Sequence, residues 1–132
     1  MTGFQWLEEY LGDMPGVTKD YKLEWGWDRY MVGGKLFAAT CCPSGKYAAE
    51  YAGHPLLTLK CDPLESEALR SRYPDILPGF YTDKRTWISV RLDGTVPEEM
   101  VRHLSEASYR LVFSTLTKKL QREISGRDTA GN

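Results

Sequence analysis

The chain of 132 residues lacks any apolar run near the roughly 20 residues that a membrane-spanning helix requires. The segment 1–12 has no basic stretch and no A-x-A cleavage site, so we expect no signal peptide and a cytoplasmic location. Histidine is scarce: His54 and His103 stand far apart, outside any H-x-x-x-H motif. No P-loop, G-x-S-x-G or G-x-G-x-x-G motif is present either. We therefore expect neither an enzyme nor a bound cofactor.

Cysteine is also rare. Cys41, Cys42 and Cys61 are odd in number, two of them are adjacent, and no C-x-x-C motif occurs. This pattern excludes a disulfide framework and the usual spacing of zinc ligands. Reduced, partly buried thiols fit a reducing compartment.

An excess of charge of one sign is missing as well. The formal net charge is −1 and the sequence pI is about 6.1, which argues against a strongly electrostatic nucleic-acid binder. The distribution is uneven, because residues 1–66 carry 9 acids and 6 bases, hence −3, and residues 67–132 carry 9 acids and 11 bases, hence +2. Only a local basic face could make this difference matter.

Hydrophobic periodicity predicts helices over 4–11, 62–72 and from 95 onward, and strands over 21–25, 28–32, 35–42, 56–61 and 85–92. A loop is expected over 74–83. The order of elements predicts an α+β protein with a mostly antiparallel sheet of five to six strands. Helices would pack on one face and leave the other open to solvent or a partner. We expect one domain over 1–124 and a disordered C-terminal tail over 125–132.

Turn and capping residues set the boundaries of these segments. Gly33-Gly34 is predicted to form a two-residue hairpin turn, because glycine enters positive φ freely. Asp62 followed by Pro63 is a typical helix start. Thr95 with Glu98 is predicted to form a capping box ahead of the last long helix.

Several segments, in this order, resemble the MmcQ/YjbR family and together cover residues 4–121. The segments are Val32-Gly33-Gly34-Lys35-Leu36-Phe37-Ala38, Leu59-Lys60-Cys61-Asp62-Pro63, Pro78-Gly79-Phe80-Tyr81 with Lys84-Arg85 and Trp87-Ile88-Ser89-Val90, Leu92-Asp93-Gly94 with Pro97, Ser108-Tyr109-Arg110-Leu111-Val112, and Leu116-Thr117-Lys118-Lys119.

The resemblance implies a frataxin-like (CyaY-like) two-layer α/β sandwich, also described as a double-wing arrangement, and a DNA-binding function. Where the family more often has an aromatic residue, a histidine and an amide before the lysine, this chain has Phe80-Tyr81-Thr82-Asp83. Any role of that histidine in relatives is therefore missing here.

The main candidate site is a stripe along the predicted strand 85–92, made of Arg85, Trp87, Ser89 and Arg91. Alternation places these side chains on the face opposite the aliphatic residues of the strand. Thr58 and Lys60 would join them from the strand 56–61, and Lys84 lies beside them. Guanidinium groups around an indole suit phosphates with a stacked base. The alternative is that Trp87 packs against a loop and the arginines are ordinary solvated residues.

Two hairpin tips are candidate wings: Gly33-Gly34-Lys35 and Pro43-Ser44-Gly45-Lys46. Their glycines let the backbone approach a phosphate, and each tip carries one lysine, Lys35 or Lys46. Plain turns, with lysines that protect edge strands from pairing, are the alternative.

Aromatic residues crowd the hairpin region. Trp25, Trp27, Tyr30, Tyr47 and Tyr51 lie within a short stretch of the chain. Core packing explains such a group. A ligand cleft between the sheet and a loop explains it as well, so both interpretations stay open.

Three functions remain open from the sequence. The first is weak, salt-sensitive DNA binding through the open sheet face and the wings. The second is a protein- or small-ligand-binding adaptor that uses the same face. The third is a frataxin-like metal binder, for which the first helix and strand offer only scattered carboxylates. These scattered carboxylates are Glu8, Glu9, Asp13, Asp20 and Glu24. We expect a monomer with no membrane partner.

Overall fold

The computed structural model describes residues 3–130. At its centre is a six-stranded sheet, antiparallel throughout, with the strand order β1-β2-β3-β4-β6-β5. The predicted α+β class and antiparallel sheet are confirmed. The strands are Val17–Lys22 (β1), Trp27–Val32 (β2), Lys35–Cys41 (β3), Leu56–Lys60 (β4), Ile76–Pro78 (β5) and Trp87–Arg91 (β6). The helices are Gln5–Gly12 (α1), Pro63–Arg72 (α2), Glu98–Phe113 (α3) and Lys118–Ala130 (α4).

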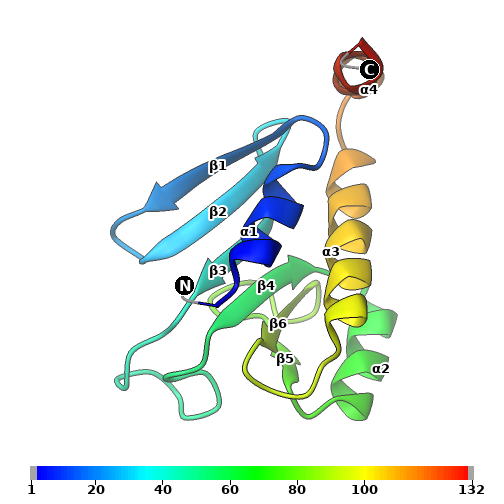
Figure 1. Ribbon diagram of the computed structural model, residues 1–132. Helices are drawn as coiled ribbons and strands as arrows, with labels where there is room; N and C mark the ends of the chain where they lie inside the picture. Colours follow the sequence, from blue (N-terminus) through cyan, green and yellow to red (C-terminus); the bar gives the residue numbers. More distant parts are fainter. Residues whose placement is uncertain (1–2, 131–132) are drawn as a thin grey trace.

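Helices α1 and α3 pack on one side of the sheet, called the helix face below (Figure 1). In α1, Leu7 and Leu11 are four residues apart, so they share one side of the helix, and both are fully buried. They join Leu57, Leu59 and other strand residues in the main core. Such close-packed burial is the largest favourable contribution to the stability of this layer.

The end of the chain forms a separate helix. The chain leaves α3 at Phe113 and starts α4 at Lys118. Leu116 and Ile124 connect this part of the chain to the main core. Helix α4 continues to Ala130, so it includes most of the segment 125–132 that the sequence assigns to a tail; residues 131–132 lie outside the described residues. Among the helices of the described chain, none has the length and apolar character that a bilayer crossing needs.

The predicted hairpin and helix start are confirmed. Gly33 and Gly34 have φ values of +58° and +78°, the left-handed conformation that a tight hairpin turn between β2 and β3 requires. Asp62 caps α2, because its carboxylate accepts hydrogen bonds from the backbone N–H groups of Leu64 (3.0 Å) and Glu65 (3.3 Å).

The predicted capping box at Thr95 is wrong. The N-cap of α3 is Pro97, and no side chain caps that helix. Thr95 instead donates hydrogen bonds from its backbone N–H (2.9 Å) and its hydroxyl (3.2 Å) to Asp75. The Thr95 hydroxyl therefore binds Asp75, which is distant in the sequence, and not the N-terminus of α3 as the local pattern predicted.

Two strand assignments also change. Strand β1 ends at Lys22, and the alternating residues Leu23 and Trp25 lie in the turn before β2, exposed by 77% and 55%. Their alternation mimics a strand, but Gly26, at a φ of +70°, closes a turn there. The predicted loop 74–83 contains the short edge strand β5.

The second face of the sheet, opposite the helices, is partly covered and not open as predicted. Loops 42–55 and 79–86 fold over it and bring Tyr51 and Phe80 onto the strand residues Ala39 and Leu56. A smaller apolar cluster forms there, separate from the main core. This second face and its two loops contain the site described next.

Candidate functional site

The predicted stripe along β6 is only partly a surface. Arg85 lies before the strand, with its side chain 85% exposed and an Asp83 carboxylate 4.0 Å away. Trp87 is half-buried and Ser89 is fully buried. The side chains do share the second face as predicted, since Ser89 faces Thr58 across the sheet. The prediction that all of them reach solvent is wrong, because loop 79–86 covers the middle of the row.

The Arg91 guanidinium has partners within the protein itself. Its guanidinium donates to Asp75 (2.9 Å) and to the carbonyl of Pro74 (3.0 Å). The hydrogen bond from the Thr95 backbone lowers the pKa of Asp75, and the bonds from the Thr95 hydroxyl and the Arg91 guanidinium lower it further, so this carboxylate stays ionised. Both side chains are mostly buried, and Arg91 holds the start of β5 against the end of β6.

Ser89 positions the loop. Its hydroxyl accepts a hydrogen bond from the backbone N–H of Phe80 (2.9 Å) and lies 2.7 Å from the Thr58 hydroxyl. Because these groups are buried, an unmade bond would cost about 1–3 kcal/mol. The pair therefore fixes the start of loop 79–86 on the sheet.

The predicted lysines of the second face lie beside aromatic rings. The ammonium of Lys60 is 5.9 Å from the centre of the Trp87 ring, and that of Lys84 is 5.8 Å from Tyr51. Lys84 also donates a hydrogen bond to the carbonyl of Gly79 (2.7 Å). Lys84 therefore belongs to loop 79–86, and Lys60 lies at the end of β4 beside Trp87, the residue that follows the loop.

The two predicted wings differ. Lys35 donates to the hydroxyl of Thr115 (3.1 Å), which ties the β2–β3 turn to the segment between α3 and α4. Lys46 lies over the ring of Tyr47 at 5.3 Å and lines a pocket on the second face. The structure therefore places Lys46, but not Lys35, in the site. A nucleic-acid role for either lysine stays a prediction.

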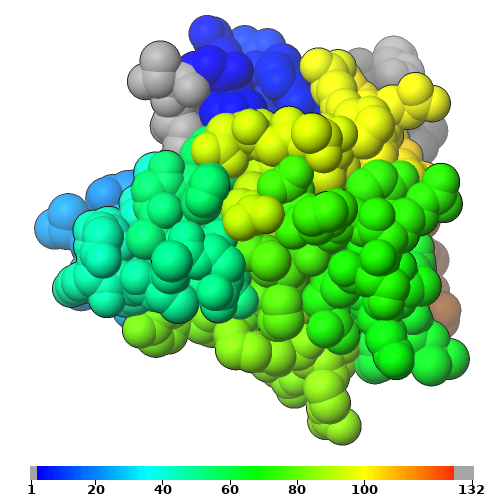
Figure 2. All heavy atoms as spheres, turned by 90° about the horizontal axis from the view of Figure 1, so that it is seen from below, coloured from blue at the N-terminus to red at the C-terminus, as the bar shows by residue number. Residues whose placement is uncertain are grey.

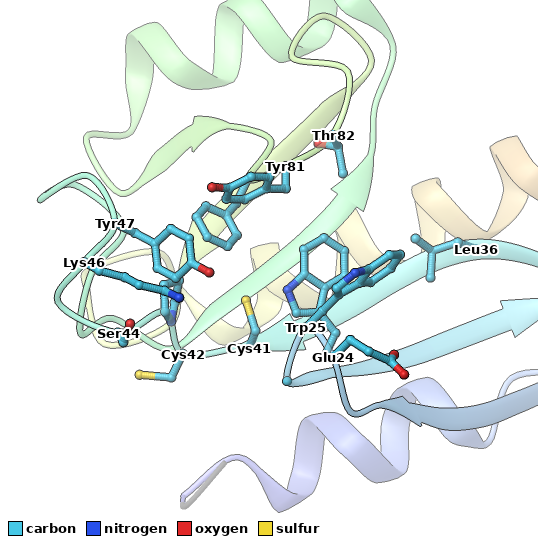
Figure 3. A pocket seen from close by; sticks show the side chains of 14 residues that line it. Glu24, Trp25, Leu36, Cys41, Cys42, Ser44, Lys46, Tyr47, Tyr81 and Thr82 are labelled. Carbon is cyan, nitrogen blue, oxygen red and sulfur yellow. The ribbon is translucent and has the colours of Figure 1, made fainter.

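The pocket has a volume of about 720 Å³ and lies between the β1–β2 turn and the two loops. In Figure 2 the teal spheres of loop 42–55 lie against the lime-green spheres of the segment around residue 80, which closes one side. Figure 3 shows Trp25 on one side of the pocket and Tyr47 with Tyr81 on the other. We call these the tryptophan wall (Trp25 and Trp27) and the tyrosine wall (Tyr47, Phe80 and Tyr81).

The rings within each wall meet edge to face. Trp25 and Trp27 lie 5.3 Å apart at 67°, and Tyr47 meets Phe80 at 5.3 Å and 84°. Tyr81 meets both Phe80 (4.7 Å) and Tyr47 (5.6 Å) at right angles or nearly so. Such pairs contribute about 0.5–1.5 kcal/mol beyond burial, so these ring contacts help to hold each wall together.

In each wall one ring is buried at the bottom of the pocket and another is exposed at its rim. Trp27 and Phe80 are each 6% exposed and meet at 6.4 Å. At the rim, Trp25 is 55% and Tyr81 72% exposed. Tyr81 has a φ of +53°, and among residues 3–130 it is the only non-glycine residue with positive φ. Holding a large side chain in this conformation costs about 1–2 kcal/mol, and such strain tends to cluster at functional sites.

Most charges at the tryptophan wall are paired. Arg29 donates two hydrogen bonds to Asp20 (2.8 and 2.6 Å), and Lys22 lies 3.5 Å from Glu24. A backbone hydrogen bond within its own residue lowers the pKa of Glu24, and the Lys22 ammonium lowers it further, so Glu24 stays ionised. This wall is therefore close to neutral.

Two cysteines, Cys41 and Cys42, line the pocket. Cys42 is exposed in the lining, whereas Cys41 and Cys61 are buried. Burial raises the pKa of the Cys41 thiol to about 12 and that of Cys61 to about 11. The thiolate is the reactive form, and of the three thiols only that of Cys42 is exposed to a reagent.

We expect an aromatic disulfide reagent to modify one thiol quickly in the native protein and all three after unfolding in denaturant. Absorbance of the released thiolate measures both counts. Cys42→Ser should remove the fast reaction while leaving two thiols in the unfolded chain. Fast modification of a second thiol in the native protein would contradict the burial of Cys41 and Cys61.

Sequence reasoning found part of this pocket. Trp25, Trp27 and Tyr47 were among the crowded aromatics. Trp27 is buried in the smaller apolar cluster with Tyr47 packed against it, as core packing predicted, and all three also line the pocket, so the ligand cleft stays a prediction. Tyr51 packs beside the wall, and Tyr30 is in the main core. Phe80 and Tyr81 were missed as site residues. The sequence did contain a sign of them: two adjacent aromatic residues lie in the predicted loop 74–83, and large aromatic side chains are usually packed against other groups.

Within residues 3–130 we find no group of three or more histidine, cysteine, aspartate or glutamate side chains placed to hold a metal ion. His54, the histidine nearest in sequence to loop 42–55, lies 2.9 Å from the Asp93 carboxylate and does not line the pocket. The frataxin-like metal function therefore has no candidate site in the described part of the chain.

Comparisons with known proteins agree on one family. The YjbR family model matches residues 12–111. The uncharacterised protein YbdF of Escherichia coli O157:H7 is 33% identical over 97 residues, covering 74% of this chain and 73% of that protein. The uncharacterised protein YjbR of Escherichia coli K12 is 27% identical over 113 residues, covering 86% and 89%.

Solved structures share the fold. The Deinococcus radiodurans protein DR2400, with domain DUF419, superposes with a TM-score of 0.75 at 29% identity and covers 90% of this chain and 85% of its own. A Pseudomonas syringae protein superposes at 0.70 with 23% identity, covering 85% and 99%, which supports the fold alone. The matched region includes both walls of the pocket, and it establishes that this chain belongs to the YjbR family.

Proposed function

We propose that this protein is a non-enzymatic binding protein and that the aromatic pocket is its binding site. The observation that carries the proposal is the pocket itself: about 720 Å³, with five aromatic side chains from three separate segments. Sites for small molecules have about 300–1,000 Å³ and are lined by apolar and aromatic groups with a few polar ones. The ligand is an organic molecule with a flat apolar part.

The exposed rims support a binding role. Two large rings stand in solvent, the indole of Trp25 exposed by 55% and the phenol of Tyr81 by 72%. The left-handed backbone at Tyr81 keeps its ring at the pocket against a conformational cost. Exposed aromatic clusters of this kind mark interaction sites on soluble proteins.

The polar groups of the pocket support binding without catalysis. Among the described lining residues there is no histidine, and the Glu24 carboxylate is next to Lys22. Lys46 stands near Ser44 in the lining, but in the described chain no hydrogen bond joins its ammonium to the Ser44 hydroxyl or to the Cys42 thiol. A nucleophile without a hydrogen-bonded base is weakly activated, so these groups suit ligand orientation.

The test is a thermal-shift screen with small aromatic compounds, followed by titration of the hits. Trp25→Ala should weaken binding by at least about fivefold, because ring stacking contributes about 1–3 kcal/mol. Stability should change little, since the side chain is half exposed. Leu23→Ala is the matched control, because Leu23 is exposed in the same turn but does not line the pocket. Hits that bind Trp25→Ala unchanged, or a library without hits, would overturn the proposal.

Duplex DNA binding through the second face is the second candidate. The observation that favours it is the pair of ring-stacked ammonium groups, Lys60 over Trp87 and Lys84 over Tyr51, with Arg85 exposed nearby. Few phosphates could be neutralised, so binding should be weak and salt-sensitive. Fluorescence anisotropy with labelled duplex DNA at about 50 mM and about 200 mM salt tests it. Absence of binding at the lower salt rules it out.

A further inference from the structure

We propose, building on the pocket as the binding site, that its ligand is a nucleotide. The base lies between the tryptophan and tyrosine walls, and the phosphate lies on the side of Lys46. The inference depends on three features: the space between the walls, the charges around them, and the polar groups at the edge.

The space suits a flat ring with an attached group. Trp25 stands on one side, and Tyr47 and Tyr81 stand on the other, with the room between them open (Figure 3). A base placed there can stack on this aromatic surface through its π-face, as every base can. A volume of about 720 Å³ exceeds the need of a single ring and leaves room for a sugar.

The charges differ between the two walls. Beside the tryptophan wall, Arg29 and Lys22 have carboxylate partners in Asp20 and Glu24. Beside the tyrosine wall, no carboxylate of the described chain lies within ion-pair distance of Lys46 or Lys84.

An anionic group therefore gains most on the tyrosine side. The Lys46 ammonium lies over the Tyr47 ring, within the lining, and is exposed, so it can turn to a phosphate without breaking an ion pair. Lysine binds phosphate as a mobile point charge. Lys84 adds a second positive charge on the adjacent loop.

Polar groups at the edge of the pocket can form hydrogen bonds with the edge of a nucleobase. Ser44 offers a hydroxyl that donates and accepts, and Glu24 offers acceptors. The hydroxyl stands near Lys46 on one side and the carboxylate near Trp25 on the other (Figure 3). A base has donors and acceptors on its edges, so either group can bond to the edge that lies on its side of the pocket.

The nucleotide can be free or part of a single strand, since both offer the same ring and phosphate. The experiment is isothermal calorimetry and tryptophan fluorescence with adenosine, adenosine monophosphate and a short oligothymidylate, on the full chain. We expect the monophosphate to bind at least about threefold more tightly than adenosine at about 50 mM salt, with a smaller ratio at about 200 mM.

Lys46→Ala should remove most of that difference, whereas Lys119→Ala, an exposed lysine of α4, should leave it intact. An oligothymidylate that binds about tenfold more tightly than the monophosphate identifies a strand as the source, and equal affinities identify a free nucleotide.

Several results would overturn the inference and are distinct from failure of the proposed function. If other ring compounds bind in the pocket but adenosine and its monophosphate do not, the nucleotide assignment is wrong and the binding site stands. If adenosine binds as tightly as the monophosphate, or Lys46→Ala keeps the difference, the phosphate position is wrong. If no aromatic compound of any kind binds, the proposed function itself fails.

Discussion

Replacing Phe80 with alanine should lower the free energy of unfolding by about 3–5 kcal/mol, the range for a buried aromatic residue cut to alanine. Phe80 is 6% exposed and contacts the rings of Trp27, Tyr47 and Tyr51. Its removal takes away these ring contacts and leaves a cavity, because close-packed neighbours relax only in part. Denaturation in urea, followed by far-ultraviolet circular dichroism, measures the loss.

Tyr81→Ala is the control for this prediction. Tyr81 is adjacent in the chain and also aromatic, but it is 72% exposed, so its removal should cost less than about 1 kcal/mol. Relief of the left-handed strain is not expected, because alanine meets the same restriction at a φ of +53°. Equal losses for the two variants would show that Phe80 does not hold the second cluster together.

Gly79→Ala should cost about 3 kcal/mol, at the upper end for added volume in a packed region. A methyl group at this position would overlap the hydroxyl of Thr82 and would lie 2.6 Å from the Cβ of Trp87. It would also lie 3.1 Å from the backbone carbon of Trp87, which cannot move without β6. We therefore expect loop 79–86 to lift from the sheet, with loss of the tyrosine wall and of ring binding.

Chemical denaturation and the thermal-shift assay measure both effects. Gly45→Ala is the matched control, because Gly45 lies in the other loop with no heavy atom within 4 Å of the added methyl group. It should change the free energy of unfolding by less than about 0.5 kcal/mol. A Gly79→Ala protein that keeps native stability and still binds ring compounds would show that the loop tolerates a wider spacing from β6.

The parts of the fold that the sequence predicted correctly rest on local chemistry. The hairpin at Gly33-Gly34 and the start of α2 at Asp62 each depend on residues that act within one turn. Strand β6 was visible because its aliphatic residues face a continuous core and alternate with others. Local signals of this kind need no knowledge of the distant chain.

The errors arise where distant segments compete. Thr95 has the correct spacing for a capping box, but Asp75, 20 residues away, binds it instead. Strand β5 has three residues and ends in Pro78, too short for a periodic signal, and it exists because it pairs with β6. Trp25 continues an alternating pattern past the end of β1, where no partner residue faces it.

In the candidate site, too, the sequence predicted what local chemistry determines and missed what depends on distant segments. Sequence placed Trp87, Ser89 and Arg91 on the correct face of β6, because alternation is a local property. It could not show that loop 79–86 covers Ser89 or that Asp75 binds Arg91. The pocket required Trp25 and Phe80, far apart in the chain, to line one space, and that depends on how both loops fold over the second face.

The central claim is that ring compounds bind between the two aromatic walls. The most direct measurement follows the indole N–H signals of the four tryptophans in ¹H–¹⁵N spectra during titration with small aromatic compounds. Trp25 and Trp27 line the pocket, whereas Trp6 packs on the helix side and Trp87 lies outside the lining. The account predicts saturable shifts of the Trp25 and Trp27 signals with the Trp6 signal unchanged. Shifts confined to Trp6 or Trp87, or no shift for any compound, would contradict it.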